Sequence, residues 1–188
     1  MPKRPGNDER HRNRRDYGYT TAPLVYNDWL IVEVGGPTGT VRAFDKQTGK
    51  SVWASQHQGF AGHSGSPVAM EVEGVPCLVD FAQFELVVMR LDKGHEGETI
   101  ATFPWESAYA NNILTPTVIG NRVLISSWHA HEKKSNPATC LLEISLSGAK
   151  ELWQKQVGSH ICSPVVVDGK IYIAGPKLLC LAWETGET

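Results

Sequence analysis

Short apolar runs, separated by turn residues, follow one another along most of the chain, and polar and apolar residues alternate within many of them. Residues 165–167 and 170–173 are two such runs, with Asp168 and Gly169 between them. An Asp-Gly pair between two β-branched runs is a strong signal for a hairpin of antiparallel strands. No segment shows the 3.6-residue apolar period of an amphipathic helix. The pattern therefore predicts an all-β protein.

The hairpins belong to a longer unit that occurs four times. Each unit opens with a small or polar residue followed by a proline, and the four prolines are Pro23, Pro67, Pro116 and Pro164. They are 44, 49 and 48 positions apart. A hairpin follows each proline, and the third strands of the four units are predicted at 40–44, 85–91, 139–144 and 178–182. We place the repeats at about 20–56, 64–106, 113–156 and 161–188.

Tandem units of about 40 to 50 residues, each with four short antiparallel strands, are typical of a β-propeller in which every unit forms one blade. A β-sandwich is the alternative all-β architecture. Four units are about half of a seven- or eight-bladed ring, so we expect a half ring or a fragment of a longer propeller. The pairing of two chains into one eight-bladed ring is a further hypothesis.

One turn in the first unit carries a motif that explains how blades pack. Residues 43–53 match the pattern A-x-D-x-x-T-G-K-x-x-W. Aspartate and threonine can bond the backbone of a tight turn, and glycine takes the position with a positive φ angle. The tryptophan then offers a large flat surface for packing between neighbouring sheets. Trp105 and Trp153 close the second and third units in the same way.

This motif resembles the tryptophan-docking motif of the pyrroloquinoline-quinone-like (PQQ-like) repeat family, which includes quinoprotein alcohol dehydrogenases and a propeller lipoprotein of the outer-membrane β-barrel assembly machinery. The resemblance covers the chain from about residue 17 onwards. The docking residues that it implies are Ala43, Asp45, Thr48, Gly49, Lys50, Trp53, Trp105 and Trp153. It also implies seven or eight blades and a periplasmic or other extracytoplasmic location. Propellers include both enzymes and binding scaffolds.

Composition and charge exclude several classes. The chain has 188 residues, of which 41% are hydrophobic, and a formal net charge of −2, so nucleic acid is not an expected partner. No apolar run approaches the ~20 residues of a membrane-spanning helix. Basic residues concentrate in segment 1–16, which has almost no apolar residues and is predicted to be a disordered tail. It lacks the apolar region of a secretory signal peptide.

The four cysteines are Cys77, Cys140, Cys162 and Cys180. They lack the C-x-x-C spacing of zinc ribbons and thioredoxin-type redox sites. Each lies in an apolar, strand-like run, so we expect buried thiols that act as small hydrophobic groups. Disulfide bonds stay open as an alternative for an exported protein.

Two sets of polar residues are candidate sites. His129 and His131 would point to the same face of a strand and form a weak candidate for a metal pair, although no third ligand is identifiable. The ends of the innermost strands crowd the central channel of a propeller, and polar or aromatic residues precede the opening prolines there. The channel-face candidates for ligand binding are Tyr19, His63, Asn111, Asn112 and His160.

These observations predict a non-catalytic PQQ-like propeller that binds a protein or a small ligand through its loops and channel face. We expect no catalytic residues and no cofactor in this chain. We also expect the chain to associate with a second copy or with the missing blades of a longer chain. The alternative is part of a PQQ-dependent alcohol dehydrogenase with bound quinone and Ca²⁺. The adjacent cysteines of many such enzymes are absent, and no acidic cluster has the spacing of a calcium site.

Overall fold

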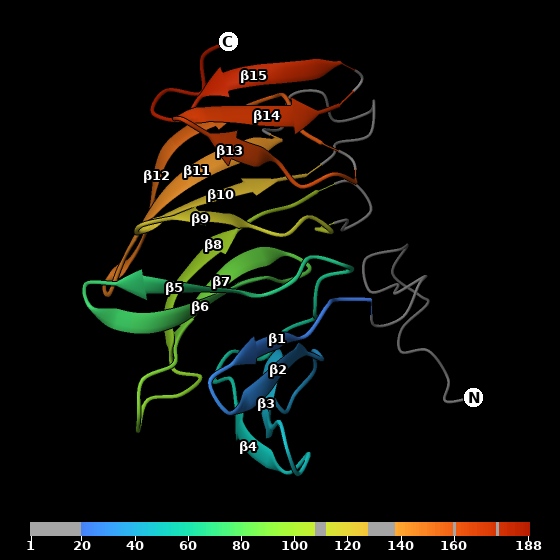
Figure 1. Cartoon of the computed structure of the whole chain (residues 1–188), viewed down its shortest axis with the longest axis vertical. Coiled ribbons are helices and arrows are strands. Elements are labelled where there is room, and N and C mark those ends of the chain that lie inside the picture. The colour runs from blue at the N-terminus through green and yellow to red at the C-terminus, as the bar shows by residue number, and fades with distance from the viewer. Residues whose placement is uncertain (1–19, 108–111, 128–137, 160, 176) are drawn as a thin grey trace.

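A computed structural model of the chain describes residues 20–107, 112–127, 138–159, 161–175 and 177–188. In these residues the regular structure consists of fifteen β-strands, which confirms the predicted all-β class. The third strands predicted for the four units match β3, β7, β11 and β15 to within one residue at either end. The strands form four antiparallel sheets, and each sheet comes from one contiguous stretch of the chain (Figure 1).

Within each sheet the spatial order of the strands follows the chain. The first sheet contains β1 (Leu24–Tyr26), β2 (Trp29–Glu33), β3 (Val41–Asp45) and β4 (Ser51–Ala54). The second contains β5 (Val68–Val72), β6 (Val75–Phe81), β7 (Glu85–Arg90) and β8 (Thr99–Pro104). The third contains β9 (Thr117–Ile119), β10 (Arg122–Ser126), β11 (Thr139–Ser145) and β12 (Gly148–Lys155). The fourth contains β13 (Val165–Val167), β14 (Lys170–Ala174) and β15 (Leu178–Ala182).

The first hairpin of the fourth sheet shows why the local sequence forms this structure. Asp168 and Gly169, which join β13 to β14, have φ angles of 49° and 71°. A two-residue turn with two positive φ angles follows the right-handed twist of the strands beside it, and Asp-Gly is one of the pairs that accept this conformation. The hairpin predicted from the sequence is therefore confirmed, with Val167 paired to Lys170 across the turn.

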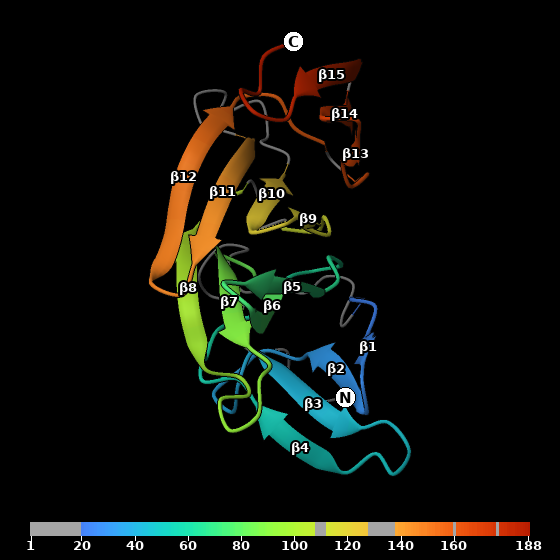
Figure 2. The same cartoon turned by 60° about the vertical axis from the view of Figure 1, so that its left-hand side comes forward.

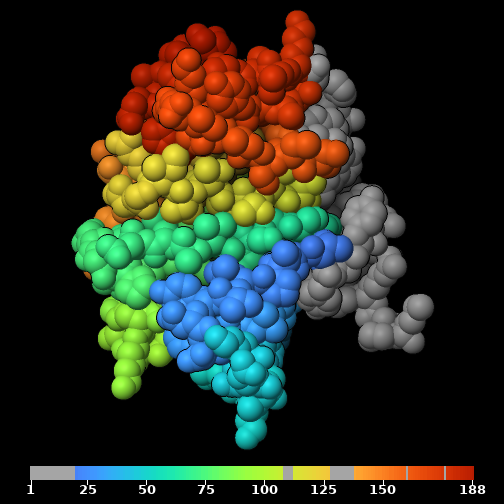
Figure 3. Space-filling model, viewed as in Figure 1, coloured from blue at the N-terminus to red at the C-terminus, as the bar shows by residue number. Residues whose placement is uncertain are grey.

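The four sheets follow one another in chain order along the long axis of the molecule, as successive blades of a β-propeller (Figures 1 and 3). The first strands of the sheets lie along one side of the stack, and β8 and β12 lie along the other (Figure 2). The first and the fourth sheets are at opposite ends of this open series (Figure 1).

Three buried apolar clusters hold consecutive sheets together. In the cluster between the first and second sheets, Ile31 and Ala43 pack against residues such as Leu78 and Met89. A second cluster joins the second sheet to the third, and a third cluster joins the third sheet to the fourth. We call the side of a sheet that contacts the next sheet along the chain its forward face, and the opposite side its rear face. All three clusters therefore join a forward face to a rear face.

The cysteines divide into two pairs. Cys77 and Cys140 are buried, as the apolar runs around them predicted, and all four thiols are free. The same prediction is wrong for Cys162 and Cys180, which are exposed. Cys180 alternates with buried Leu181 along β15, and it lies on the side of the fourth sheet that faces away from the third sheet, where no described segment covers it. Burial of one face of a strand depends on the neighbouring sheet, which the local sequence does not encode.

Candidate functional site

Side-chain hydroxyl groups link the opening segments of successive repeats. They lie at the same position in their repeats, directly before the opening proline. The backbone N–H of Ser66 donates to Oγ1 of Thr115 at 3.1 Å, and the backbone N–H of Thr115 donates to Oγ of Ser163 at 3.0 Å. All three residues directly precede the proline that opens their repeat. A residue before proline is restricted to extended conformations, which fixes the direction of its N–H group. These bonds form a ladder across the second, third and fourth sheets.

Thr20 extends this contact to the N-terminal side of the first sheet. Its hydroxyl donates to the carbonyl oxygen of His63 and lies 3.2 Å from Oγ of Ser64. The segment leading into β1 is thus attached to the segment leading into β5. The opening segments of all four repeats are consequently joined by side-chain hydroxyl groups.

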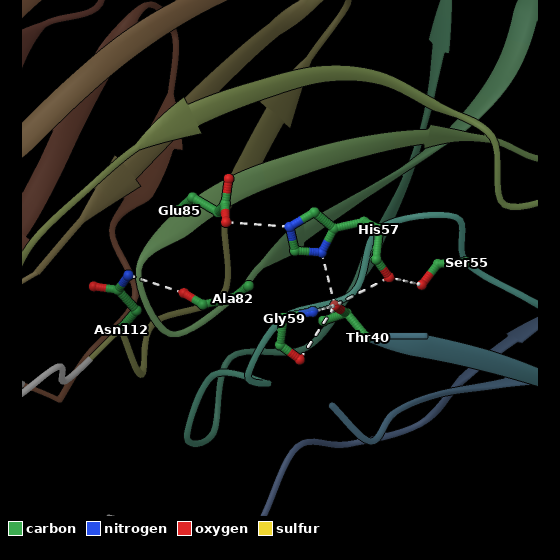
Figure 4. A network of polar contacts seen from close by, with 7 residues as sticks. All are labelled: Thr40, Ser55, His57, Gly59, Ala82, Glu85 and Asn112. Carbon is green, nitrogen blue, oxygen red and sulfur yellow. Dashed lines mark hydrogen bonds and ion pairs between the residues drawn. The ribbon is translucent and has the colours of Figure 1, made fainter. Parts of the chain in front are cut away.

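Asn112 lies in the interior beside this ladder. Its Nδ2 donates to the carbonyl oxygens of Ala82 at 2.9 Å, Gln83 at 3.1 Å and Trp105 at 3.4 Å (Figure 4 shows the first of these). Its own backbone carbonyl accepts the N–H of His63 at 3.2 Å. Asn112 has no exposed surface, and its amide hydrogens are used to connect the second sheet with the opening of the third.

The buried carboxylate of Glu33 connects the first sheet to the loop between β4 and β5. Glu33 at the end of β2 accepts the backbone N–H of Gly62 through Oε1, and its side chain is almost fully buried. A Cβ atom on Gly62 would collide with the carbonyl oxygen of Phe81. Only glycine therefore fits between the end of β6 and the carboxylate of Glu33.

A second polar network lies between the first two sheets (Figure 4). Oγ1 of Thr40 is 2.7 Å from Nδ1 of His57 and accepts the backbone N–H of Gly59 at 2.8 Å. Nε2 of His57 is 3.1 Å from Oε1 of Glu85 in β7. Ser55 donates through Oγ to the carbonyl oxygen of His57 at 2.8 Å. His57 is thereby held at both ring nitrogens, one by each sheet.

The order hydroxyl, imidazole and carboxylate in this network is that of a nucleophilic triad. A nucleophile must be reachable by its substrate, and Thr40 is 0% exposed. Its hydroxyl is also occupied by the N–H of Gly59. The arrangement therefore positions the loop after β4 and does not present a nucleophile. The sequence carried no signal for this set, because its members come from different loops and strands that only the sheet packing brings together.

The turn with the complete motif has the predicted hydrogen bonds. Oδ1 of Asp45 accepts the backbone N–H and the hydroxyl of Thr48, both at 2.7 Å. These bonds stabilise the charged carboxylate, so they hold the pKa of Asp45 below its usual value of 3.8. Gly49 has a φ angle of 69°, and the backbone N–H of Asp45 donates to the carbonyl of Lys50 at 2.8 Å.

The tryptophans of the second and third units connect each of these sheets to the next. Nε1 of Trp105 donates to Oγ of Ser127 at 2.9 Å, and Nε1 of Trp153 donates to the carbonyl oxygen of Trp183 at 2.9 Å. Trp53 packs half-buried beside the cluster that contains Ala43, with its ring edge-to-face against Trp29 at a centroid distance of 5.8 Å. Among the described atoms, its buried Nε1 has no hydrogen-bond partner.

The sequence-derived candidates are placed in two groups. His63 and Asn112 are buried between the sheets, so neither side chain is presented to solvent. The predicted tail 1–16 and five candidates lie outside the described residues, and these candidates are Tyr19, Asn111, His160, His129 and His131. Within the described ranges, no group of three or more His, Cys, Asp or Glu residues could hold a metal ion. In that same part of the chain, no helix is long and apolar enough to span a membrane.

A comparison with protein families relates the chain to a known family. A family model described as outer membrane protein assembly factor BamB matches residues 5–188. Among the curated proteins compared with the chain, none matches it. The match includes all four sheets of the structure.

Proposed function

From the premise that the chain belongs to the PQQ-like repeat family of the outer membrane protein assembly factor BamB, we propose that it is a non-catalytic propeller scaffold. The supporting observation is that its buried polar groups form hydrogen bonds within the protein itself. Asn112, Glu33 and the hydroxyl ladder connect one sheet to another. Such groups rigidify the ends of the sheets, from which loops can bind a protein or a small ligand.

The proposal includes no bound quinone and no Ca²⁺. A hard cation needs several oxygen ligands at one place. In the part of the chain that the structure describes, no group of three or more His, Cys, Asp or Glu residues could hold a metal ion. We therefore derive no redox step and propose that the scaffold works without this cofactor.

Exposed apolar side chains on the loops support a binding role. Phe60 is exposed in the loop between β4 and β5, where it packs edge-to-face against Phe84 at 6.3 Å. Ile161 is exposed in the segment that leads into β13. Contiguous exposed apolar surface is typical of contact sites for other proteins. We propose that the partner is a protein or a small ligand bound at these loops, and that a second copy or further blades cover the end sheets.

The relationship to an outer-membrane assembly factor supports a location outside the cytoplasm, which is part of the proposal. Fractionation of cells that express the full-length gene product tests it directly. Recovery in the periplasmic or membrane fraction is the expected result, and recovery with cytoplasmic markers would contradict it.

Two measurements test the scaffold function. The first is the thermal unfolding temperature with and without pyrroloquinoline quinone and Ca²⁺, combined with a dye-linked assay of alcohol oxidation. A ligand that binds the native state raises this temperature. We expect no rise and no turnover, and a rise accompanied by turnover would show that the chain is an oxidoreductase.

The second measurement is affinity capture from cell extract with the wild type and with Phe60→Asp and Ile161→Asp. We expect one discrete partner that both variants lose and that Val52→Asp retains, since Val52 is exposed within β4 and belongs to neither loop. Capture that does not depend on Phe60 or Ile161 would argue against these loops as the binding site.

A further inference from the structure

Two phenylalanines meet at the loop end of the first two sheets. Phe60, in the loop between β4 and β5, is 44% exposed, and its ring lies edge-to-face against that of Phe84 at a centroid distance of 6.3 Å. The carbonyl oxygen of Phe60 accepts the backbone N–H of Gln83 at 3.1 Å. This bond fixes the loop on the turn between β6 and β7, so the aromatic pair is held in place while the ring of Phe60 stays open to solvent.

Two carboxylates lie beside this aromatic pair. Glu85 follows Phe84 in the chain, and its side chain is 31% exposed. The backbone N–H of Trp105 donates to the carbonyl oxygen of Phe84 at 2.8 Å, which brings the next residue, the exposed Glu106, to the same place. We call Phe60, Phe84, Glu85 and Glu106 the Phe60 surface.

This end of the first two sheets carries charge of one sign. The charged residues among its described connecting segments and the strand ends beside them are Glu33, Glu85 and Glu106, and no lysine or arginine occurs there. Carboxylates that are grouped in this way create a negative potential, which favours a cationic ligand. The segments are 34–40, 55–67, 82–84 and 105–107.

The chain contains a segment of the opposite charge that leads to this place. Segment 1–16 has six Lys or Arg residues against three Asp or Glu residues, and it lies outside the described residues. Thr20, the first described residue, donates its hydroxyl to the carbonyl oxygen of His63. His63 is three positions after Phe60 in the same loop. The basic segment therefore enters the described structure beside the loop of the Phe60 surface.

The last two arginines of the segment can reach this surface. Arg15 and Arg14 are five and six positions before Thr20, and an extended chain spans up to ~3.3–3.6 Å per residue, which gives a reach of roughly 15–20 Å. The three positions between His63 and Phe60 cover at most about 10 Å of chain. Docking of these arginines therefore requires no movement of the sheets.

We propose that segment 1–16 docks on the Phe60 surface of the same chain through Arg14 and Arg15. A guanidinium group forms paired hydrogen bonds with a carboxylate, and its plane also packs on aromatic rings. The Phe60 surface offers both partners, an exposed carboxylate at Glu106 and an accessible ring at Phe60. Because the attraction is electrostatic and close to solvent, salt should weaken it.

The consequence of this contact rests on the proposed scaffold function. Phe60 is one of the loop residues proposed to contact a partner, so a docked segment would compete with that partner for the same surface. The contact itself is tested on the purified chain without any partner. Failure of the contact therefore leaves the scaffold proposal and its capture experiment unaffected.

Limited digestion of the full chain with an arginine-specific protease tests the contact. The rate of cleavage after Arg12 is measured at low and at high salt, and each rate is divided by that of a synthetic peptide of residues 1–16 with the matching sequence. We expect this relative rate to be about tenfold lower in ~20 mM than in ~0.5 M NaCl. Phe60→Ala and Glu106→Lys should remove the protection at low salt.

The matched control is Glu71→Lys. Glu71 is exposed in β5 next to the turn into β6, at the other end of the sheet, and its replacement changes the net charge by the same amount. It should keep the protection. The variant with Arg14→Glu and Arg15→Glu should lose it, and the further change Glu106→Lys should restore it, whereas Glu71→Lys should not.

A second measurement does not depend on the protease. In the full chain labelled with fluorophenylalanine, the ¹⁹F resonance of Phe60 is identified by its absence in Phe60→Leu. It should shift when Arg14 and Arg15 are both replaced by glutamate, while that of Phe103 should not. Cleavage of the wild type at the rate of the free peptide in low salt, or equal effects of Glu106→Lys and Glu71→Lys, would overturn the proposal and leave the surface to another protein.

Discussion

Gly186, in the turn after β15, lies directly against the indole ring of Trp153 from β12. A Cβ atom on Gly186 would come within 2.8 Å of Cε3 of that ring. The same ring donates through Nε1 to the carbonyl oxygen of Trp183 at 2.9 Å. The turn that contains Gly186 in the fourth unit therefore receives the tryptophan of the third unit.

Replacing Gly186 by alanine should destabilise the protein more than the same change at Gly49. The two glycines have nearly equal φ angles, 66° and 69°, so alanine meets the same backbone strain of about 1 kcal/mol at both sites. A Cβ at Gly49 has nothing within 4 Å, whereas one at Gly186 meets the indole ring. We expect Gly186→Ala to lose a further ~1–3 kcal/mol through overpacking. Urea unfolding of the two variants measures this difference, and equal losses would contradict the docking contact.

Loss of one hydroxyl in the ladder should weaken the contact between the second and third sheets. Thr115→Val removes the acceptor of the Ser66 N–H while it keeps the β-branched shape of the side chain. An unsatisfied N–H group costs about 1–2 kcal/mol if water cannot replace the acceptor. Thr102→Val at an exposed position of β8 is the control and should change the free energy of unfolding by less than about 0.5 kcal/mol. Similar free energies for both variants would show that the ladder contributes nothing.

Two of the four thiols should react with a thiol reagent in the native protein. Burial raises the pKa of Cys77 to about 11 and that of Cys140 to about 12, so at pH 8 both are protonated as well as shielded. Cys162 and Cys180 are exposed and should react first. A colorimetric count should therefore rise from two to four on unfolding in guanidinium chloride. Cys180→Ser should lower the native count to one, and a native count of four would mean that the two buried strands are open.

The turn at Asp45 should become weaker in acid. The hydrogen bonds from Thr48 hold the pKa of Asp45 below 3.8, so the stabilisation is present above pH 3.8 and is lost as the pH falls through the lowered value. NMR titration of the carboxyl carbon measures that pKa directly. Thr48→Val should raise it towards 3.8, while Gln47→Ala, which keeps the backbone N–H of residue 47, should leave it unchanged. A pKa that Thr48→Val does not move would show that the hydroxyl is not a partner of Asp45 in solution.

The parts of the fold that were predictable are those that neighbouring residues decide. Asp168 and Gly169 determine a hairpin by their own φ preferences, and Asp45 bonds a residue three positions away. Because the proline and hairpin pattern is repeated along the chain, the same local signals predicted four units. The assignment of faces was not predictable, because β15 alternates apolar residues on both sides and only the third sheet decides that Leu181 is buried and Cys180 is not.

The contacts of the candidate site were harder to predict from the sequence, because they too depend on how the sheets pack. His63 and Asn112 were chosen by their position before the prolines, and the structure places them among backbone carbonyl and N–H groups. The contact of His57 with Glu85 spans 28 residues and two sheets. A lone histidine and a lone glutamate at that separation carry no local pattern, so only the packing of the sheets reveals the pair.

Because each buried cluster joins two consecutive sheets, the folding free energy divides into a contribution from each sheet and one from each contact between neighbours. The molecule is in this sense a short one-dimensional lattice, in which each inner sheet has two neighbours and each end sheet has one. Opening should start at the ends and move inwards, so the amides that exchange slowest with solvent should be those of β6, β7, β10 and β11.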